Sequence, residues 1–300
     1  MTTFSESRMR LCPALALLLL SSSVALAAQA AQQQGYFDLD GGKLYYEVAG
    51  QGHPLVLIHG GQLDHRIWDE QFEFFSKRYR VVRYDARGFG NSPRSTKVYA
   101  DEDDLAALLK HLQIDKAYIV GLSLGGRIAI DFALAHPGMV DAIVPVAPGL
   151  SGFNFGNDPN FFATLEASQS GNWEKAADLW LQSGYMAPAM KNPAIAPRLR
   201  QWAIENAHQN MDNPFLERIL KPPAMERLQE IRVPVLIVVG SLDVTDILEI
   251  AGLCYARIPG AQEVVIQNSG HIVNMEQPQQ FNSVVLDFLE RQKPVKMEKR

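Results

Sequence analysis

Short apolar runs alternate along this chain with longer segments whose apolar residues recur every three or four positions. Runs typical of strands occur at residues 54–59, 80–84, 118–120 and 140–146, and the first of them is continuously apolar. Amphipathic stretches between and after them predict helices at residues 67–77, 101–112 and 127–135. A continuous apolar run is typical of a strand buried on both faces, and strict β-α alternation predicts a mostly parallel sheet with helices on both faces.

The alternation of predicted strands and helices occurs on both sides of a middle region that has a different pattern. Residues 36–39 and 43–48 predict a hairpin that turns at residues 40–42. After residue 225 the pattern resumes, with strands expected at residues 233–240 and 263–266 and helices at residues 245–256 and 277–291. We therefore predict an α/β fold with a doubly wound sheet, formed by residues 35–148 and 226–292.

The middle region, residues 149–225, contains no run that predicts a parallel strand. Its periodicity indicates helices at residues 160–168, 173–182 and 196–206, and it is rich in aromatic side chains. Any one of these aromatic residues can simply pack between helices. Together they favour a helical lid, inserted in the core, over an apolar pocket.

The first thirty residues have the features of a signal peptide. Two arginines precede the apolar run at residues 11–20, and small residues follow with suitable cleavage positions after Ala27 or Ala30. The run is short for a membrane span, although an uncleaved N-terminal anchor is the alternative. We expect a periplasmic or secreted protein, without stable membrane association after cleavage.

The cysteines and the net charge argue against several kinds of anchoring and binding for this protein. Cys12 precedes the apolar run, which argues against a lipid anchor at the cleavage site, and Cys254 lies in an apolar helical stretch typical of a packed core residue. The formal net charge is −5 at pH 7 with no basic stripe, so nucleic-acid binding is not expected. Residues 293–300 are predicted to be a solvated tail.

One glycine-rich turn carries the main chemical signal. Gly121, Ser123 and Gly125 form a G-x-S-x-G pattern, followed by Gly126, between a predicted strand and a predicted helix. This is the pattern of a nucleophile elbow, where a strained turn exposes one hydroxyl and the flanking glycines let the chains pass closely. The alternative is a serine that only caps an ordinary helix.

Two further predicted strands end in residues that could activate this serine. Asp243 follows the strand at residues 233–240, and His271 follows the strand at residues 263–266. A serine hydroxyl needs an imidazole to take its proton, and the imidazole needs a carboxylate to orient it. Asp243 could instead cap the next helix, and Asp246 competes for the same role.

The oxyanion formed in such a reaction needs two N–H donors. We expect one to be the backbone amide of Leu124, directly after the nucleophile. The other should come from the loop after residues 54–59, from the amide of Gly61 or alternatively Gln62.

The remaining histidines do not show the spacing of metal ligands, and we predict neither a metal nor a cofactor. His59 is expected to order the glycine loop that follows it. His111 and His136 lie at or near predicted helix C-termini, where a cation suits the helix dipole. Surface or lid positions are predicted for His53, His65 and His208.

These motifs together resemble the α/β-hydrolase superfamily. The resemblance rests on residues 59–61, 85–92, 121–126, 240–243 and 270–271, and it covers residues 36–291 with the lid least matched. The motifs are similar to those of small esterases, enol-lactonases, C–C bond hydrolases and proline iminopeptidases. The resemblance also implies structural roles for Asp85 and Arg87. A serine at the elbow departs from the aspartate of epoxide hydrolases and haloalkane dehalogenases.

We therefore predict an exported, cofactor-independent serine hydrolase whose substrate is a small carboxylic ester or lactone. A C–C bond hydrolase or an iminopeptidase on the same scaffold is the alternative, and an iminopeptidase would need lid acids such as Glu166, Glu174 or Glu205 to bind the substrate amine. A non-catalytic ligand-binding protein is the alternative from another class.

Overall fold

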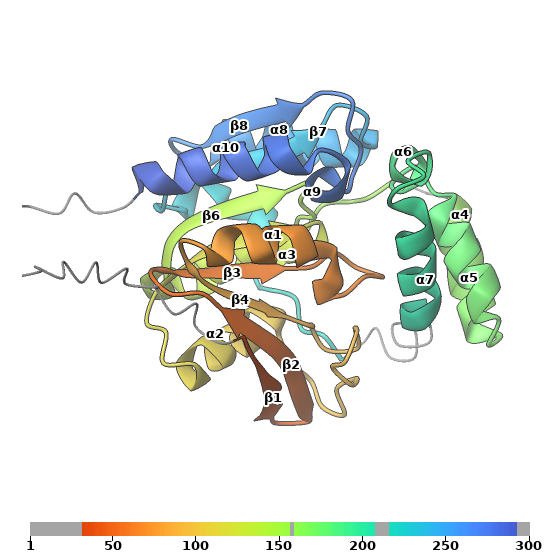
Figure 1. Ribbon diagram of the computed structural model, residues 1–300, viewed down its shortest axis with the longest axis horizontal. Helices are drawn as coiled ribbons and strands as arrows, with labels where there is room; N and C mark the ends of the chain where they lie inside the picture. The colour runs from red at the N-terminus through yellow and green to blue at the C-terminus, as the bar shows by residue number, and fades with distance from the viewer. Residues whose placement is uncertain (1–31, 157–158, 208–215, 293–300) are drawn as a thin grey trace, which may run out of the picture.

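The computed structural model describes residues 32–156, 159–207 and 216–292. Three predictions lie outside these residues: the signal peptide at residues 1–30, the tail at residues 293–300, and the position of His208. Within the described residues the strands form one eight-stranded sheet in the order β1-β2-β4-β3-β5-β6-β7-β8 (Figure 1).

The sheet confirms the predicted α/β class. The strands are β1 (Gln33–Leu39), β2 (Gly42–Ala49), β3 (Pro54–Ile58), β4 (Arg80–Tyr84), β5 (Ala117–Leu122), β6 (Val140–Val146), β7 (Leu236–Gly240) and β8 (Gln262–Ile266). β1 pairs antiparallel with β2, and β2 with β4, while every pairing from β4 to β8 is parallel. β5 is buried at all six positions. Such continuous burial explains why its sequence does not alternate between apolar and polar residues.

Helices flank this sheet. Those of the core are η1 (His65–Trp68), α1 (Asp69–Ser76), α2 (Asp101–His111), α3 (Leu124–Ala135), η2 (Pro137–Met139), α8 (Thr245–Arg257), α9 (Val273–Glu276) and α10 (Pro278–Arg291). α1 packs beside α10, and α2 beside α3. Among the described helices, none combines the length and the apolar character that a membrane span requires.

Residues 147–235, which we call the insertion, connect β6 to β7. Its helices are α4 (Pro159–Gln169), α5 (Trp173–Leu181), α6 (Ala187–Met190), α7 (Ala196–Ala207), η3 (Ala224–Glu226) and η4 (Leu228–Glu230). Figure 1 shows α4 to α7 gathered together at one end of the sheet. The three predicted helices of this region are confirmed, whereas the four-residue α6 was not predicted because it is shorter than two turns of periodic pattern.

Two of the differences between the predicted and the observed elements have a clear physical reason. The strand expected at residues 233–240 begins at Leu236, because Pro234 has no N–H to donate to a neighbouring strand. The helix expected at residues 67–77 is divided into η1 and α1, with Asp64 capping η1 through a side-chain bond to the Arg66 amide.

An ion-pair network joins the insertion to α3. Arg127 on α3 donates to Asp101 at 2.7 Å, to Glu217 of the insertion at 2.5 Å and to Asp131 at 3.3 Å. Ser151, at the start of the insertion, donates to Asp131 at 2.7 Å. Burial, and next the negative charge of Glu217, raise the pKa of Asp101, while the Arg127 guanidinium acts in the opposite direction.

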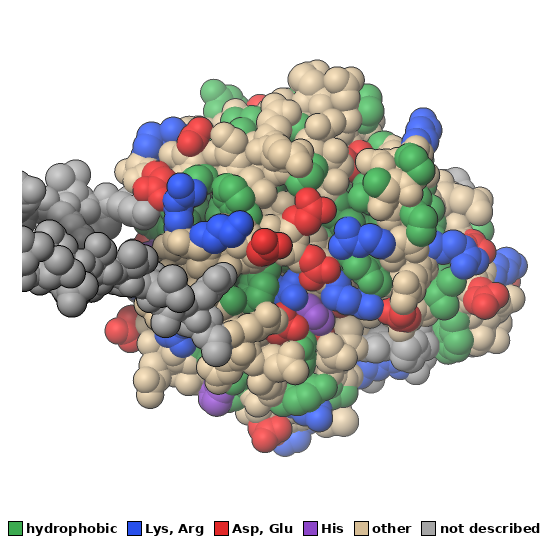
Figure 2. All heavy atoms as spheres, viewed as in Figure 1, with side chains coloured by type: hydrophobic (Ala, Val, Ile, Leu, Met, Phe, Trp, Pro, Cys, Tyr) green, Lys and Arg blue, Asp and Glu red, His purple; other side chains and the backbone are tan. Residues whose placement is uncertain are grey.

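The surface charges of the face in Figure 2 are mixed. Lys and Arg side chains lie between Asp and Glu side chains there, rather than in a block of one sign. This distribution accords with the small formal net charge of −5.

Candidate active site

The predicted elbow is a strained turn between β5 and α3. Ser123 has φ 54° and ψ −108°, a conformation that a non-glycine residue rarely adopts without a compensating gain. A Cβ atom at Gly121 would collide with the carbonyl of Gly125, and one at Gly125 would collide with the carbonyl of Ile58. The Gly125 amide donates to the His59 carbonyl at 3.1 Å. Both flanking glycines are therefore required by close backbone approach, as the pattern predicts.

Asp243 and His271 lie together at the ends of β7 and β8. Nδ1 of His271 is 3.0 Å from Oδ2 and 3.1 Å from Oδ1 of Asp243, and both side chains are buried. This contact places the imidazole proton on Nδ1 and leaves Nε2 as the basic nitrogen. Asp246 does not compete, because it accepts the Gly156 amide of the insertion at 2.7 Å.

The loop that carries His271 is held by Glu276, which the sequence did not indicate as a functional residue. Glu276 on α9 accepts the Gly270 amide at 2.9 Å and the Ile272 amide at 3.2 Å, one on each side of His271. Burial raises the pKa of its carboxyl group. The spacing of five residues after the histidine is the one local signal that could have indicated this contact.

His59 orders the glycine loop after β3, as predicted. The Ala86 amide donates to its Nε2 at 3.0 Å, so its proton is on Nδ1, which donates to the Gly60 carbonyl at 2.8 Å. Because the carbonyl and the following N–H of a trans peptide point in opposite directions, the Gly61 amide faces away from the His59 ring. Complete burial lowers the pKa of His59 and keeps it neutral.

The candidate oxyanion donors lie on the two loops that meet at Ser123. A Cβ atom on Gly60 would lie 3.5 Å from Cβ of Ser123, so the loop after β3 runs directly beside the elbow. Leu124 is the first residue of α3, where N–H groups have no partner within the helix. Gly61 and Gln62 both line the adjoining cavity.

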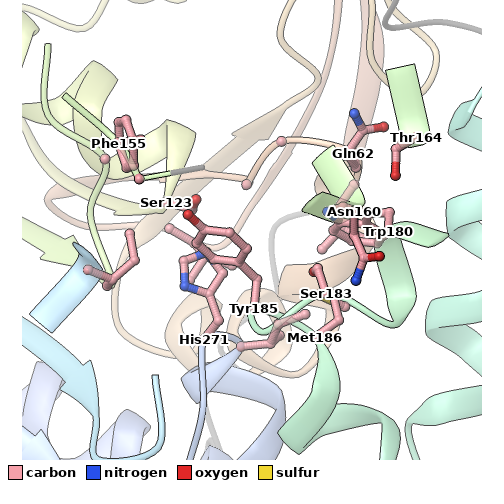
Figure 3. Close-up of a pocket in the computed structure, with 18 residues that line it drawn as sticks. Gln62, Ser123, Phe155, Asn160, Thr164, Trp180, Ser183, Tyr185, Met186 and His271 are labelled. Carbon is pink, nitrogen blue, oxygen red and sulfur yellow. The ribbon is translucent and has the colours of Figure 1, made fainter. Parts of the chain in front are cut away.

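A cavity of about 470 Å³ opens over the elbow. Its lining includes Ser123 and His271 from the core and Tyr185 from the insertion (Figure 3). The Tyr185 ring meets the His271 ring edge to face, with centroids 5.1 Å apart. The other lining residues are largely apolar or neutral polar, among them Leu63, Leu122, Phe155, Asn160, Thr164, Trp180, Ser183, Met186, Ile247 and Ile272.

One histidine prediction is wrong. His65, expected at a surface or lid position, is 6% exposed and its Nδ1 lies 2.8 Å from Asp85. Asp64, His65 and Asp85 approach closely enough to suggest metal ligands. However, Asp64 accepts hydrogen bonds from Arg66 and Asn206, and these donors occupy the oxygens that a metal would need.

Asp85, Arg87 and Cys254 have surroundings of a structural kind. Asp85 accepts the backbone amides of His65 and Asn91, each at 2.8 Å, and Arg87 forms a two-point ion pair with Asp104. Burial raises the pKa of the Cys254 thiol to about 12, which keeps it protonated. These contacts support the structural roles expected of the three residues.

A sequence profile described as the alpha/beta hydrolase family matches residues 55–284, which is more than two thirds of the chain. The chain belongs to the alpha/beta hydrolase family. The matched region of this alpha/beta hydrolase contains the elbow, both strand-end residues and the whole insertion. The family assignment thus agrees with the strand order and with the resemblance seen in the motifs.

Individual relatives of this alpha/beta hydrolase are distant but cover nearly its whole fold. It is 28% identical over 256 residues to 3-oxoadipate enol-lactonase 2 of Acinetobacter baylyi, covering 83% of this chain and 93% of that protein. It is 26% identical over 256 residues to pimeloyl-[acyl-carrier protein] methyl ester esterase of Aeromonas hydrophila, covering 81% and 98%. The solved structure of Est816, described as an N-acyl homoserine lactone degrading enzyme, superposes with a TM-score of 0.68 at 28% identity, covering 85% and 100%.

Proposed function

We propose that this alpha/beta hydrolase is an exported serine hydrolase that cleaves carboxylic esters or lactones. One observation carries the proposal: Ser123 and the imidazole of His271, which is paired with Asp243, line the same cavity. The three relatives described above act, by their names, on an ester or on lactones, which supports this bond type.

In the proposed reaction, Ser123 attacks the substrate carbonyl while Nε2 of His271 accepts its proton. Asp243 holds the imidazole and stabilises the cation that forms. The backbone amides of Leu124 and of Gly61, or alternatively Gln62, donate to the oxyanion, and both Gly61 and Gln62 line the cavity. The imidazolium then protonates the leaving alkoxide, and water activated by His271 releases the acyl group.

An iminopeptidase reaction has less support from the structure. Glu205 is paired with Arg66 at 2.6 Å, while Glu166 and Glu174 are exposed. None of the three is among the described residues that line the cavity. A substrate amine would therefore lack a carboxylate partner there. C–C bond hydrolysis would use the same serine and remains the alternative to be excluded by assay.

The decisive experiment is Ser123→Ala, measured with p-nitrophenyl esters of graded chain length. Loss of the nucleophile should lower kcat/KM by about 10⁴-fold or more. Ser283→Ala is the matched control, because Ser283 is exposed on α10. An unchanged rate in Ser123→Ala would overturn the proposal. Folded wild-type protein that neither hydrolyses esters nor reacts with a fluorophosphonate would favour a non-catalytic binding protein.

Export rests on the features of residues 1–30 alone. Expression of the full chain in a bacterial host should give mature protein in the periplasm or medium that begins at residue 28 or 31. N-terminal sequencing of the recovered protein tests this expectation. Full-length protein retained in the membrane fraction would favour an uncleaved anchor instead.

A further inference from the structure

Two residues of the insertion that line the cavity have buried hydroxyl groups without a partner among the described residues. Thr164 on α4 is 5% exposed and Ser183, just after α5, is 3% exposed, and both residues line the cavity. Neither Oγ1 of Thr164 nor Oγ of Ser183 has a hydrogen-bond partner among the described residues. These two oxygens therefore stand out against the general rule that buried polar groups are paired.

The loss of stability caused by unpaired hydroxyl groups indicates that these two groups serve a function. A buried hydroxyl without a partner destabilises the folded protein, whereas a valine at position 164 or an alanine at position 183 would avoid that cost. Another serine of the insertion, Ser170, donates normally to the Ala167 carbonyl at 2.8 Å. Other buried polar atoms of the described residues also lack a partner, at Trp68, Tyr84, Ser269 and Asn274, but Thr164 and Ser183 are the two such residues described that line the cavity.

Neutral polar groups gather at this part of the cavity. Figure 3 shows Gln62, Asn160, Thr164 and Ser183 on one side of the cavity and Ser123 with His271 on the other. Among the described lining residues, no Asp, Glu, Lys or Arg is present. A charged substrate group would lose its hydration there without gaining a counter-ion.

We propose that Thr164 and Ser183 form a subsite for an uncharged hydrogen-bonding group of the substrate, such as a carbonyl, an amide or a hydroxyl. This group lies away from the bond that is cleaved, and an apolar chain connects the two. The inference rests on the proposed ester or lactone hydrolysis and adds to it the class of substrate. Each hydroxyl can donate or accept, so the subsite suits any of the three groups.

Matched substrate pairs test the subsite. On the acyl side, p-nitrophenyl 6-oxoheptanoate is compared with p-nitrophenyl heptanoate, and on the alcohol side 5-oxohexyl acetate is compared with hexyl acetate. Each pair differs by one ketone oxygen at matched chain length. In at least one pair we expect the wild-type kcat/KM to be about tenfold or more higher for the ketone, because an apolar chain leaves the two hydroxyls unpaired.

Two variants assign the preference to named atoms. Thr164→Val keeps the side-chain shape and Ser183→Ala removes only the hydroxyl. Each should lower the ketone preference several-fold, and circular dichroism with thermal unfolding checks that each variant is folded. Ser170→Ala is the control in the same insertion and should not alter the preference.

The outcomes separate this inference from the proposed function. No ketone preference in either wild-type pair, or a preference that survives in the Thr164→Val, Ser183→Ala double variant, would overturn the subsite while ester hydrolysis stands. Loss of the ketone preference in the double variant, with hydrolysis of the plain ester retained, supports the subsite. Hydrolysis of none of the four esters by folded protein would instead count against the proposed function.

Discussion

The two sides of the cavity differ in how their polar groups are satisfied. On the sheet side, the Ser123 amide donates to the Val146 carbonyl at 2.8 Å, and the Ser123 carbonyl accepts the amides of Arg127 and Gly149. His271 is held by Asp243 and by a loop whose amides bind Glu276. On the insertion side, Thr164 and Ser183 have buried oxygens without a partner.

This difference matches two separate tasks. Bond cleavage requires the reacting groups to be fixed before the substrate arrives, since small misplacements cost large factors in rate. Recognition is completed only when the substrate supplies the missing partner. Changes on the sheet side should therefore affect folding or kcat, whereas changes on the insertion side should affect KM or substrate preference.

The largest effect on the sheet side is expected from Gly125→Ala. Its Cβ atom would overlap the carbonyls of Ile58 and His59, so the elbow cannot keep its geometry. We expect a loss of about 3 kcal/mol in the free energy of unfolding, which lowers Tm by roughly 6–12 °C. Thermal unfolding measures this, with Gly138→Ala as control, because Gly138 has open space around its Cβ position. Equal stability of both variants would contradict the close-approach argument.

A smaller effect is expected from Glu276→Gln. Glutamine has one acceptor oxygen and can hold only one of the Gly270 and Ile272 amides, so His271 becomes less well placed. kcat should fall about tenfold with KM unchanged, while Glu249→Gln, exposed on α8, should have no effect. A rise in KM at constant kcat would show that Glu276 does not act through His271.

The same variant has a pH signature of defined sign. Burial raises the folded-state pKa of Glu276 above its ordinary value of 4.5, so the folded protein binds this proton more tightly than the unfolded chain. Wild-type protein therefore loses stability from this group as the pH rises through the raised pKa. Glutamine does not titrate, so the stability of the variant relative to wild type should increase between about pH 4.5 and pH 7. Denaturant unfolding at both pH values measures the change.

The smallest effect is expected on the insertion side, from Phe155→Ala. Phe155 lines the cavity, is 42% exposed and meets Phe153 edge to face. Removal of this half-exposed ring should raise KM for a long-chain ester by about threefold and leave kcat unchanged. Tyr255→Ala, 53% exposed on α8, is the matched control. A fall in kcat without a change in KM would contradict the proposed division between the two sides.

The fold could be predicted closely because its signals are local. The strands β4 and β6 have the predicted bounds, since each is a short run rich in β-branched residues between turn or loop residues. The order of serine, aspartate and histidine also indicated one strand-end site, because parallel strands present their carboxyl ends at one edge. Each of the three residues is found a few positions after the end of its own predicted strand, so the signal that marks it is local.

The missed features depend on contacts between distant segments. His65 is buried because Asp85, twenty residues later, binds both its amide and its ring. Tyr185 meets His271 across 86 positions of sequence. The unpaired state of Thr164 and Ser183 is a property of the packed cavity, and no composition or periodicity records it. These contacts need coordinates.

The ion pairs of Arg127 have a consequence for how such a protein can diversify. They fasten the insertion at two points, near its start at Ser151 through Asp131 and in its later part at Glu217 directly, to the helix that follows the nucleophile. We therefore expect substitutions in the chain between these two anchor points to change the substrate range while Ser123, Asp243 and His271 keep their places.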